Sequence, residues 1–186
     1  GFEFAPADAY VLAEEWDILR TVRGATMTIQ VGDKVPSVKL MHMGEGGPEP
    51  VTTDDLFKGK KVVVFGVPGA FTPTCSAKHL PGFIQHADEL KAKGVDAIVC
   101  TAVNDVFVMS AWGKDQGAGD KVLMVADGDA EFTKATGLEL DLTGKGLGLR
   151  NQRFAMVVDD GVVKALSIDA GGKFEQTSAE VVLKAL

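Results

Sequence analysis

Short apolar runs rich in β-branched residues alternate with helix-like stretches along most of this chain, and this alternation constrains the fold more than any other feature. The runs predicted to be buried strands are Lys61–Val67, Val95–Val103 and Val122–Ala126. The stretches predicted to be helices are Cys75–Lys93, Asp105–Gly113, Ala130–Thr136 and Ser178–Leu186. Strands that alternate with helices in this way form a sheet covered by helices, so an α/β fold is expected.

A hairpin near the C-terminal end adds antiparallel strands to this sheet. Two apolar runs, Phe154–Val158 and Val162–Ile168, flank an Asp-Gly pair at residues 160 and 161. Asp-Gly between alternating apolar runs is a strong signal for a tight β-turn. The sheet is therefore expected to be mixed, with parallel and antiparallel pairs.

Several smaller elements follow from local signals. We expect Thr53 and Asn104 to cap short helices, and Pro81 to kink or break the helix in which it lies. The segments predicted to be short strands are Thr28–Val31 and Val38–Met43. The segments predicted to be loops, because they are rich in glycine, are Gly44–Pro50 and Leu138–Asn151.

The chain of 186 residues is long enough for one domain with a complete core. We place that domain at residues 27–186, because the strand and helix pattern begins after Met27. Residues 1–26 are predicted to be an N-terminal extension, either an added segment or an accessory amphipathic helix around Ala7–Arg20. This extension is acidic and lacks the basic start and long apolar core of a secretory signal.

Charge and cysteine content exclude several classes of protein. The net charge of −7 argues against a nucleic acid or an anionic membrane as partner. No apolar run is long enough to span a membrane, which takes about 18 residues or more. The chain has two cysteines, with neither CxxC nor zinc-ligand spacing, so no metal is expected. A reducing, cytoplasmic location fits this composition.

Cys75 is the strongest candidate for a functional residue. It follows a buried strand and the segment Pro68–Thr74, and it begins a helix-like stretch. A cysteine at a strand-to-helix junction meets free backbone N–H groups and the positive end of the helix dipole, which favour the reactive thiolate form. Thr72 can place a hydroxyl beside the sulfur. The expected role of Cys75 is that of a nucleophile.

Other residues are weaker candidates. His79 lies four residues after Cys75 and can share its helix face, where it could assist the chemistry or serve only as a structural hydrogen-bonding group. Arg153 precedes a buried strand and could hold a thiolate and an oxygen ligand together, although an arginine there is often a solvated surface charge. Arg150 is a second candidate for the same role. Cys100, within a predicted central strand, fits a structural core residue.

Two motifs that suggest ligands carry little weight. The glycine-rich segment Gly144–Leu149 lacks the spacing of a phosphate-binding loop and does not join a strand to a helix. The acidic residues Asp127, Asp129 and Glu131 do not match a calcium-binding loop, and we interpret them as a solvated turn.

Taken together, several separated strings resemble the peroxiredoxins, and in detail their atypical type II branch, also called type 5. The active-site signature has the form Pro68-x3-Thr72-x2-Cys75. The longer strings that carry the resemblance are Phe65–Cys75, His79–Phe83, Val103–Val108, Ala111–Gly113 and Arg153–Val158. They agree in order and spacing over about residues 28–186.

This resemblance implies a thioredoxin-like fold and a thiol-dependent peroxidase that reduces hydrogen peroxide and alkyl hydroperoxides without a metal or organic cofactor. It implies that Cys75 is the peroxidatic cysteine, which becomes a sulfenic acid. Thr72 would hydrogen-bond the thiolate and the peroxide, Pro68 would shield the pocket, and Arg153 would be the catalytic arginine. The family also implies a homodimer and a role in antioxidant defence.

The resemblance leaves the recycling of Cys75 open. The stretch Gly171–Glu180 contains no cysteine where some members carry a resolving cysteine. Cys100 matches a second cysteine of many members, but its strand position makes a direct disulfide with Cys75 difficult. We therefore expect reduction by an external thiol such as glutathione with glutaredoxin, or thioredoxin. The alternatives are a disulfide oxidoreductase, which the absence of CxxC disfavours, and a peroxide sensor or redox-regulatory binding protein.

Overall fold

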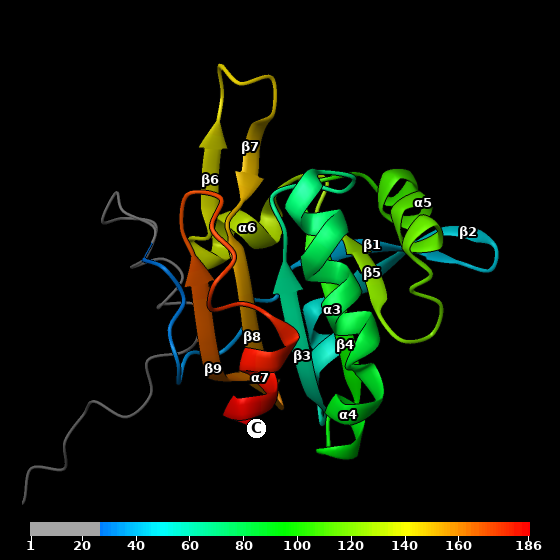
Figure 1. The fold of residues 1–186 in the computed structure, drawn as a ribbon, viewed down its shortest axis with the longest axis vertical. Coiled ribbons are helices and arrows are strands. Elements are labelled where there is room, and N and C mark those ends of the chain that lie inside the picture. The colour runs from blue at the N-terminus through cyan, green and yellow to red at the C-terminus, as the bar shows by residue number, and fades with distance from the viewer. Residues whose placement is uncertain (1–26) are drawn as a thin grey trace, which may run out of the picture.

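The computed structural model describes residues 27–186, which form one seven-stranded mixed sheet with helices on both faces and a separate two-stranded ribbon (Figure 1). The predicted extension at residues 1–26 lies outside the described residues. The sheet order is β2-β1-β5-β4-β3-β8-β9. Its strands are β1 (Lys39–Gly44), β2 (Gly47–Thr52), β3 (Lys61–Gly66), β4 (Ala97–Ala102), β5 (Leu123–Ala126), β8 (Arg153–Asp159) and β9 (Val162–Asp169).

The three central strands are parallel and the outer ones are antiparallel. β3 pairs in parallel with β4, and β4 with β5, while β8 runs antiparallel to both β3 and β9. This arrangement confirms the expected thioredoxin-like α/β fold with a mixed sheet. The predicted hairpin at the Asp-Gly turn is β8–β9, and it carries a bulge between Val157 and Val158.

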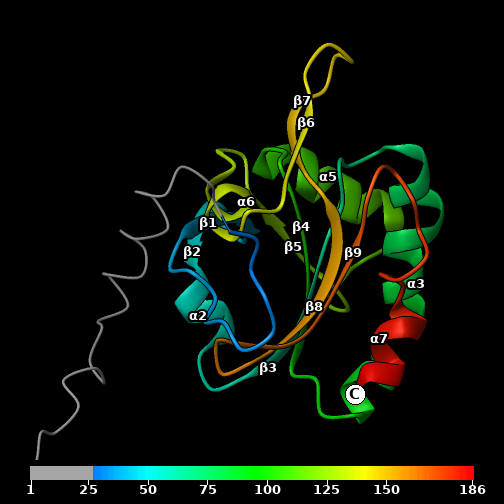
Figure 2. The same cartoon turned by 90° about the vertical axis from the view of Figure 1, so that its left-hand side faces the viewer.

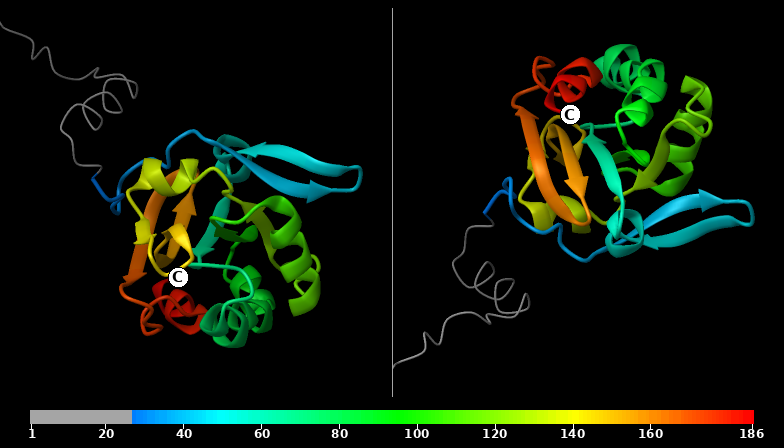
Figure 3. Two further views of the ribbon diagram at one scale, coloured as in Figure 1. Left: turned by 90° about the horizontal axis from the view of Figure 1, so that it is seen from above. Right: turned by 90° about the horizontal axis from the view of Figure 1, so that it is seen from below.

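Helices cover the two faces of the sheet unequally (Figures 2 and 3). One face carries η1 (Cys75–His79), α3 (Leu80–Gln85), α4 (Ala87–Ala92), α5 (Val106–Gln116) and α7 (Ala179–Ala185). The other face carries α2 (Thr53–Phe57) and α6 (Glu131–Thr136). Side chains of β3 alternate between the two cores, with Val63 and Phe65 in the first and Val62 and Val64 in the second. Burial on both faces explains why β3 is apolar throughout.

Two predicted loops are hairpins instead. Within the range predicted as the loop Gly44–Pro50, β2 begins at Gly47 and pairs with β1. Its two prolines are tolerated because β2 is an edge strand of the sheet. The predicted loop Leu138–Asn151 contains β6 (Glu139–Leu142) paired with β7 (Gly148–Asn151), and Figure 1 shows this ribbon extending from the body of the fold. High glycine content hid both hairpins, because glycine signals a turn without showing how far the strands on either side continue.

Other local predictions were wrong at their boundaries. The predicted strand Thr28–Val31 is not a strand; Ile29 is buried and donates its N–H to the Thr136 carbonyl. The predicted helix Cys75–Lys93 is divided into the π-helical η1, then α3 and α4. Pro81 lies in the first turn of α3, directly after η1, so one division falls beside the proline that was predicted to kink or break this helix.

The capping residues also differ from the predictions by one position. Thr52, rather than Thr53, accepts from the Asp55 N–H at the start of α2. Asp105, rather than Asn104, caps α5 by accepting from the Val108 N–H. Within residues 27–186, no helix has the length and apolar character needed to cross a membrane.

Candidate active site

The loop between β3 and η1 is folded tightly by its own hydrogen bonds. The Thr72 hydroxyl donates to the Gly69 carbonyl at 2.7 Å, and the Ala70 N–H donates to the Asn104 side chain at 2.9 Å. Phe71 has a φ of +60°, which is uncommon for a bulky residue, and its side chain is 53% exposed. This backbone conformation lies in the turn in which the Thr72 hydroxyl reaches the Gly69 carbonyl, just before the helical turn that begins at Cys75.

Cys75 is the first residue of the π-helical turn, and its side chain is 1% exposed. Its carbonyl accepts from the Leu80 N–H, five residues on, which is the hydrogen bond of a π-helix. This wide turn places Cys75 and His79 on the same face of the helix, as their shared contact with the guanidinium group of Arg153 shows. The predicted shared face is therefore confirmed.

Arg153 connects the two residues from the opposite element. As the first residue of β8 it lies beside the end of β3, and its side chain is 3% exposed. Its Nη2 lies 3.2 Å from the Cys75 sulfur, and its Nη1 lies 2.8 Å from the Nδ1 of His79. The alternative that Arg153 is a solvated surface charge is wrong.

The positive charge of Arg153 has no carboxylate partner in the described part of the chain, where every salt bridge joins a histidine to a glutamate. Its Nε has no hydrogen-bond acceptor among these residues either. A buried cation is costly unless a negative group lies close to it. The group that this charge does contact is the Cys75 sulfur, 3.2 Å from Nη2.

His79 is a neutral hydrogen-bonding group. It is completely buried, and its Nε2 lies 2.8 Å from the Thr177 carbonyl. Arginine can only donate, so Nδ1 must accept and Nε2 must carry the proton. Burial, followed by the positive charge of Arg153, lowers the pKa of His79 to about 3. His79 therefore cannot act as an acid near neutral pH.

Thr72 and Pro68 both make hydrogen bonds within the loop that precedes Cys75 or to its backbone. The Gly69 carbonyl can only accept, so the Thr72 hydroxyl donates its one hydrogen bond there. The Thr72 oxygen can therefore bind a further group only as an acceptor. The Pro68 carbonyl accepts from Nη1 of Arg150 at 3.4 Å. Arg150 thus contacts the loop backbone, in contrast to Arg153, which contacts the sulfur itself.

Cys100 is buried in β4, directly opposite Phe65 of β3. Burial, together with the nearby Cys75, raises the pKa of the Cys100 thiol well above its usual range. Both cysteines are free thiols in this structure. These features are those of a core residue, in keeping with the structural interpretation of Cys100.

Trp112 and Thr177 support the site but were not predicted from the sequence. The indole of Trp112 donates to the Ser76 hydroxyl at 3.0 Å and so joins α5 to η1. Thr177 reaches His79 from the segment before α7. Asp127, predicted to be in a solvated turn, is instead buried and accepts from Phe132 and Thr133 at the start of α6. None of these contacts is local in sequence except the last, which a capping pattern could have indicated.

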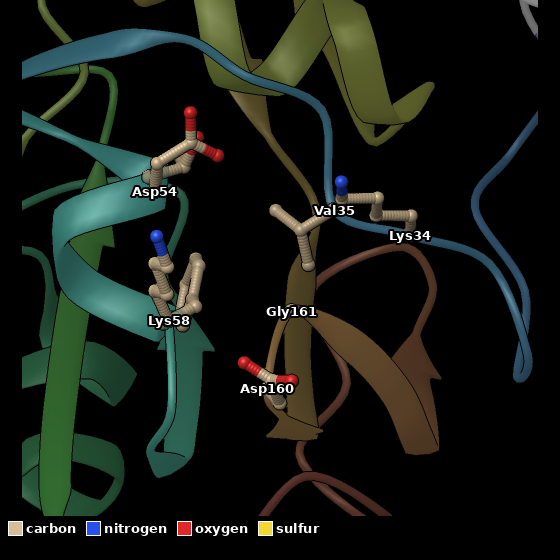
Figure 4. Close-up of a pocket in the computed structure, with 8 residues that line it drawn as sticks. Lys34, Val35, Asp54, Lys58, Asp160 and Gly161 are labelled. Carbon is tan, nitrogen blue, oxygen red and sulfur yellow. The ribbon is translucent and has the colours of Figure 1, made fainter. Parts of the chain in front are cut away.

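A separate pocket lies away from this cluster, between α2 and the β8–β9 turn (Figure 4). Its volume is about 370 Å³, and its charged lining residues are Lys34, Asp54, Lys58 and Asp160. Two of these already serve the fold, since Asp54 accepts from Ser37 and Asp160 accepts from the Gly59 N–H. The pocket contains no residue of the Cys75 cluster.

The fold and the cluster together define a thioredoxin-fold protein with a buried, arginine-paired cysteine at the end of a central strand. The family model described as Redoxin matches residues 30–183. Peroxiredoxin-2E, chloroplastic, of Arabidopsis thaliana is 52% identical over 87% of this chain and 70% of its own length. The chain belongs to the Redoxin family and is a peroxiredoxin, an oxidoreductase of the thiol peroxidase class.

Solved structures agree with this assignment. Reduced Prx3 in complex with H₂O₂ from Vibrio vulnificus is 53% identical, with a TM-score of 0.82 over 85% of this chain and 99% of that chain. Peroxiredoxin 5 from Alvinella pompejana is 35% identical, with a TM-score of 0.74 over 84% of this chain and 97% of that chain. The likeness therefore extends over nearly all of the described domain.

Proposed function

We propose that Cys75 is the peroxidatic nucleophile and that the protein reduces hydrogen peroxide and alkyl hydroperoxides. The observation that carries this proposal is the 3.2 Å contact between Nη2 of buried Arg153 and the Cys75 sulfur, in the absence of any salt-bridged carboxylate on Arg153 within residues 27–186. The H₂O₂ complex of the related Vibrio vulnificus protein supports the same substrate class.

The step is a displacement at oxygen. The Cys75 thiolate attacks one peroxide oxygen, the S–O bond forms as the O–O bond breaks, and the leaving alkoxide or hydroxide takes up a proton. Sulfur is oxidised to the sulfenic acid, and the hydroperoxide is reduced to an alcohol and water, or to two waters in the case of H₂O₂, once the sulfenic acid is recycled. Donors that face the developing charge lower the barrier.

Arg153 and Thr72 are assigned complementary roles in this step. The Nε–H of Arg153 has no acceptor among the described residues, so a peroxide oxygen would supply one. The Thr72 oxygen, whose own proton goes to Gly69, would accept the hydroperoxide O–H and orient it. Pro68, held through its carbonyl by Arg150, would limit the entry of water to the pocket.

We assign recycling to an external thiol. Two thiols reduce the sulfenic acid to a thiol, with release of water and a disulfide, and glutathione with glutaredoxin or thioredoxin can supply them. Cys100 is 0% exposed on a central strand, which supports a structural rather than a resolving role.

The test is hydrogen peroxide consumption with each reductant, comparing the wild type with Cys75→Ser and Cys100→Ser. Loss in Cys75→Ser alone is the expected result. Loss in both variants would place Cys100 in recycling, and a Cys75–Cys100 disulfide should then be visible by mass spectrometry. Oxidation of Cys75 without turnover by either reductant would favour a peroxide sensor, and activity that survives Cys75→Ser would refute the assignment.

We further propose that the chain is of the atypical type II (type 5) branch, that it is a homodimer and that it acts in the cytoplasm. The motif strings and the likeness to peroxiredoxin 5 from Alvinella pompejana support the branch.

The exposed aromatic side chains Phe71 and Phe107, 53% and 65% exposed, are apolar surface that a second subunit could cover. Light scattering tests the dimer, and imaging of the native protein tests the compartment, with a chloroplast as the alternative suggested by the name of the plant relative.

A further inference from the structure

We propose that Asp169, Thr177 and His79 form a relay of positioning residues that aims Arg153 at the Cys75 sulfur while leaving the arginine charge unneutralised. This inference rests on the proposed role of Cys75 as a nucleophile. It assigns a function to Asp169 at the end of β9, a function to Thr177 in the segment between β9 and α7, and a specific role to His79.

The first link is the contact between His79 and Arg153. The neutral Nδ1 of His79 accepts from Nη1 at 2.8 Å, which fixes one arm of the guanidinium, and the other arm then reaches the sulfur at 3.2 Å. A guanidinium is rigid and planar, so holding Nη1 determines where Nη2 points. His79 is itself clamped, because a rotated ring would lose both hydrogen bonds inside a buried site.

The second link sets the orientation of His79. The Thr177 carbonyl accepts from Nε2 and thereby selects the tautomer in which Nδ1 is the acceptor. Thr177 is fully buried, and its position depends on Asp169. The Asp169 carboxylate accepts from the Thr177 hydroxyl at 2.8 Å and from the Thr177 N–H at 3.2 Å.

Asp169 also folds the rest of this segment. It accepts from the N–H groups of Glu175 and Gln176 at about 3.0 Å, so four donors of the segment meet one carboxylate. The segment carries Phe174, whose ring centroid lies 5.8 Å from the Arg153 guanidinium carbon and 5.1 Å from the His79 ring. Figure 2 shows the chain passing from β9 over this end of the fold toward α7.

The relay keeps a negative charge from touching the arginine. Asp169 is opposite Arg153 in the β8–β9 register, yet its carboxylate is used by the backbone of the following segment. A neutral imidazole, and not a carboxylate, meets Nη1. A carboxylate at the position of His79 would form a buried ion pair with Arg153 and would compete with the Cys75 thiolate for its charge.

The test compares His79→Asn, His79→Leu and His79→Asp in a Cys100→Ala background, so that Cys75 is the sole thiol. The readouts are the rate of Cys75 alkylation by iodoacetamide as a function of pH and the second-order rate of reaction with hydrogen peroxide. His86→Asn is the matched control, because this partly buried histidine follows α3 and contacts Glu89 and Glu180 rather than the Cys75 cluster. Circular dichroism establishes that each variant is folded.

Asparagine retains an acceptor near the Nδ1 position, so His79→Asn should stay close to the control in both readouts. His79→Leu should react about tenfold more slowly at neutral pH, the effect of losing one hydrogen bond to a charged group. His79→Asp should be slower still, with its alkylation profile displaced to higher pH. A merely structural role for His79 would lower the rate equally at every pH and would leave the profile in place.

Wild-type profiles and peroxide rates in both His79→Leu and His79→Asp would overturn the relay. If His79→Leu does not fold, Thr177→Val replaces it in the test, because it removes only the hydroxyl that donates to Asp169. Its alkylation profile should be displaced to higher pH, by less than that of His79→Asp. Alkylation does not use peroxide, so a wild type that alkylates as expected but consumes no peroxide would refute the proposed function and not the relay.

Discussion

Replacing Arg153 by glutamine is the most direct perturbation of the active site. The side chain is buried, and its Nη2 lies 3.2 Å from the Cys75 sulfur. At this distance two unit charges attract by about 5 kcal/mol for an effective dielectric constant of about 20. This figure is an upper bound, because the guanidinium charge is spread over three nitrogens and glutamine retains a dipole. A hydrogen bond to a charged group contributes about 1.5–3 kcal/mol.

A loss of about 3 kcal/mol in transition-state stabilisation corresponds to a rate about a hundredfold lower. We therefore expect Arg153→Gln to be oxidised by hydrogen peroxide about a hundredfold more slowly than the wild type. Trp112 offers the assay, because its indole bonds to Ser76, the residue after Cys75, and its fluorescence should respond to oxidation in a stopped-flow instrument. A control variant, Arg150→Gln, removes the contact to Pro68 and should have a much smaller effect.

Arg153→Lys separates charge from geometry. Lysine keeps the positive charge but lacks the planar fork that bonds His79 and Cys75 together. Its rate should lie between those of the wild type and Arg153→Gln. If Arg153→Gln is oxidised within about threefold of the wild-type rate while folded, the reasoning that the arginine stabilises the reacting sulfur is wrong.

Three further predictions concern stability. Hydrogen bonds, first with Glu89 and then with Glu180, raise the pKa of His86 above its ordinary 6.5. The stability that these contacts add should therefore be present at acidic pH and lost as pH rises through the raised pKa. In His86→Ala the melting temperature should depend less on pH over that window, as thermal denaturation at several pH values would show. Cys100→Ala should lower unfolding free energy by about 1–2 kcal/mol through the lost packing, with an unchanged rate of Cys75 oxidation, and denaturant titration measures it. Asp127→Ala removes the buried cap of α6 and should cost about 2 kcal/mol in the same titration, whereas a change below about 0.5 kcal/mol would contradict the capping role.

Elements that depend on local signals were largely predictable. The strand Lys61–Gly66 and the β8–β9 hairpin are confirmed because an unbroken apolar run and an Asp-Gly turn each lie within a few residues. The predicted loops failed at β2 and at the β6–β7 ribbon for the opposite reason, since glycine and proline dominate their composition. Whether such a segment pairs with a neighbour depends on the strand available beside it.

The pairing between β8 and β9 could not be predicted by counting residues from the turn. Counting back from the turn in regular steps pairs Arg153 with Ile168, but the bulge at Val157 and Val158 moves the pairing by one residue, to Asp169. A one-residue shift of register moves side chains to the other face. The carboxylate that folds the segment around Thr177 could therefore not be placed from the sequence.

By itself the sequence determined the position of Cys75 between a buried strand and a helix, the spacing of Thr72 and His79 around it, and the order of most strands and helices. These features depend on residues within about two turns of one another, where periodicity and turn chemistry act. The tertiary structure alone decided that Arg153 reaches the sulfur across 78 residues and that Thr177 reaches His79 across 98. Both contacts exist because β8 packs beside β3, and that pairing is set by burial of the whole sheet rather than by any local signal.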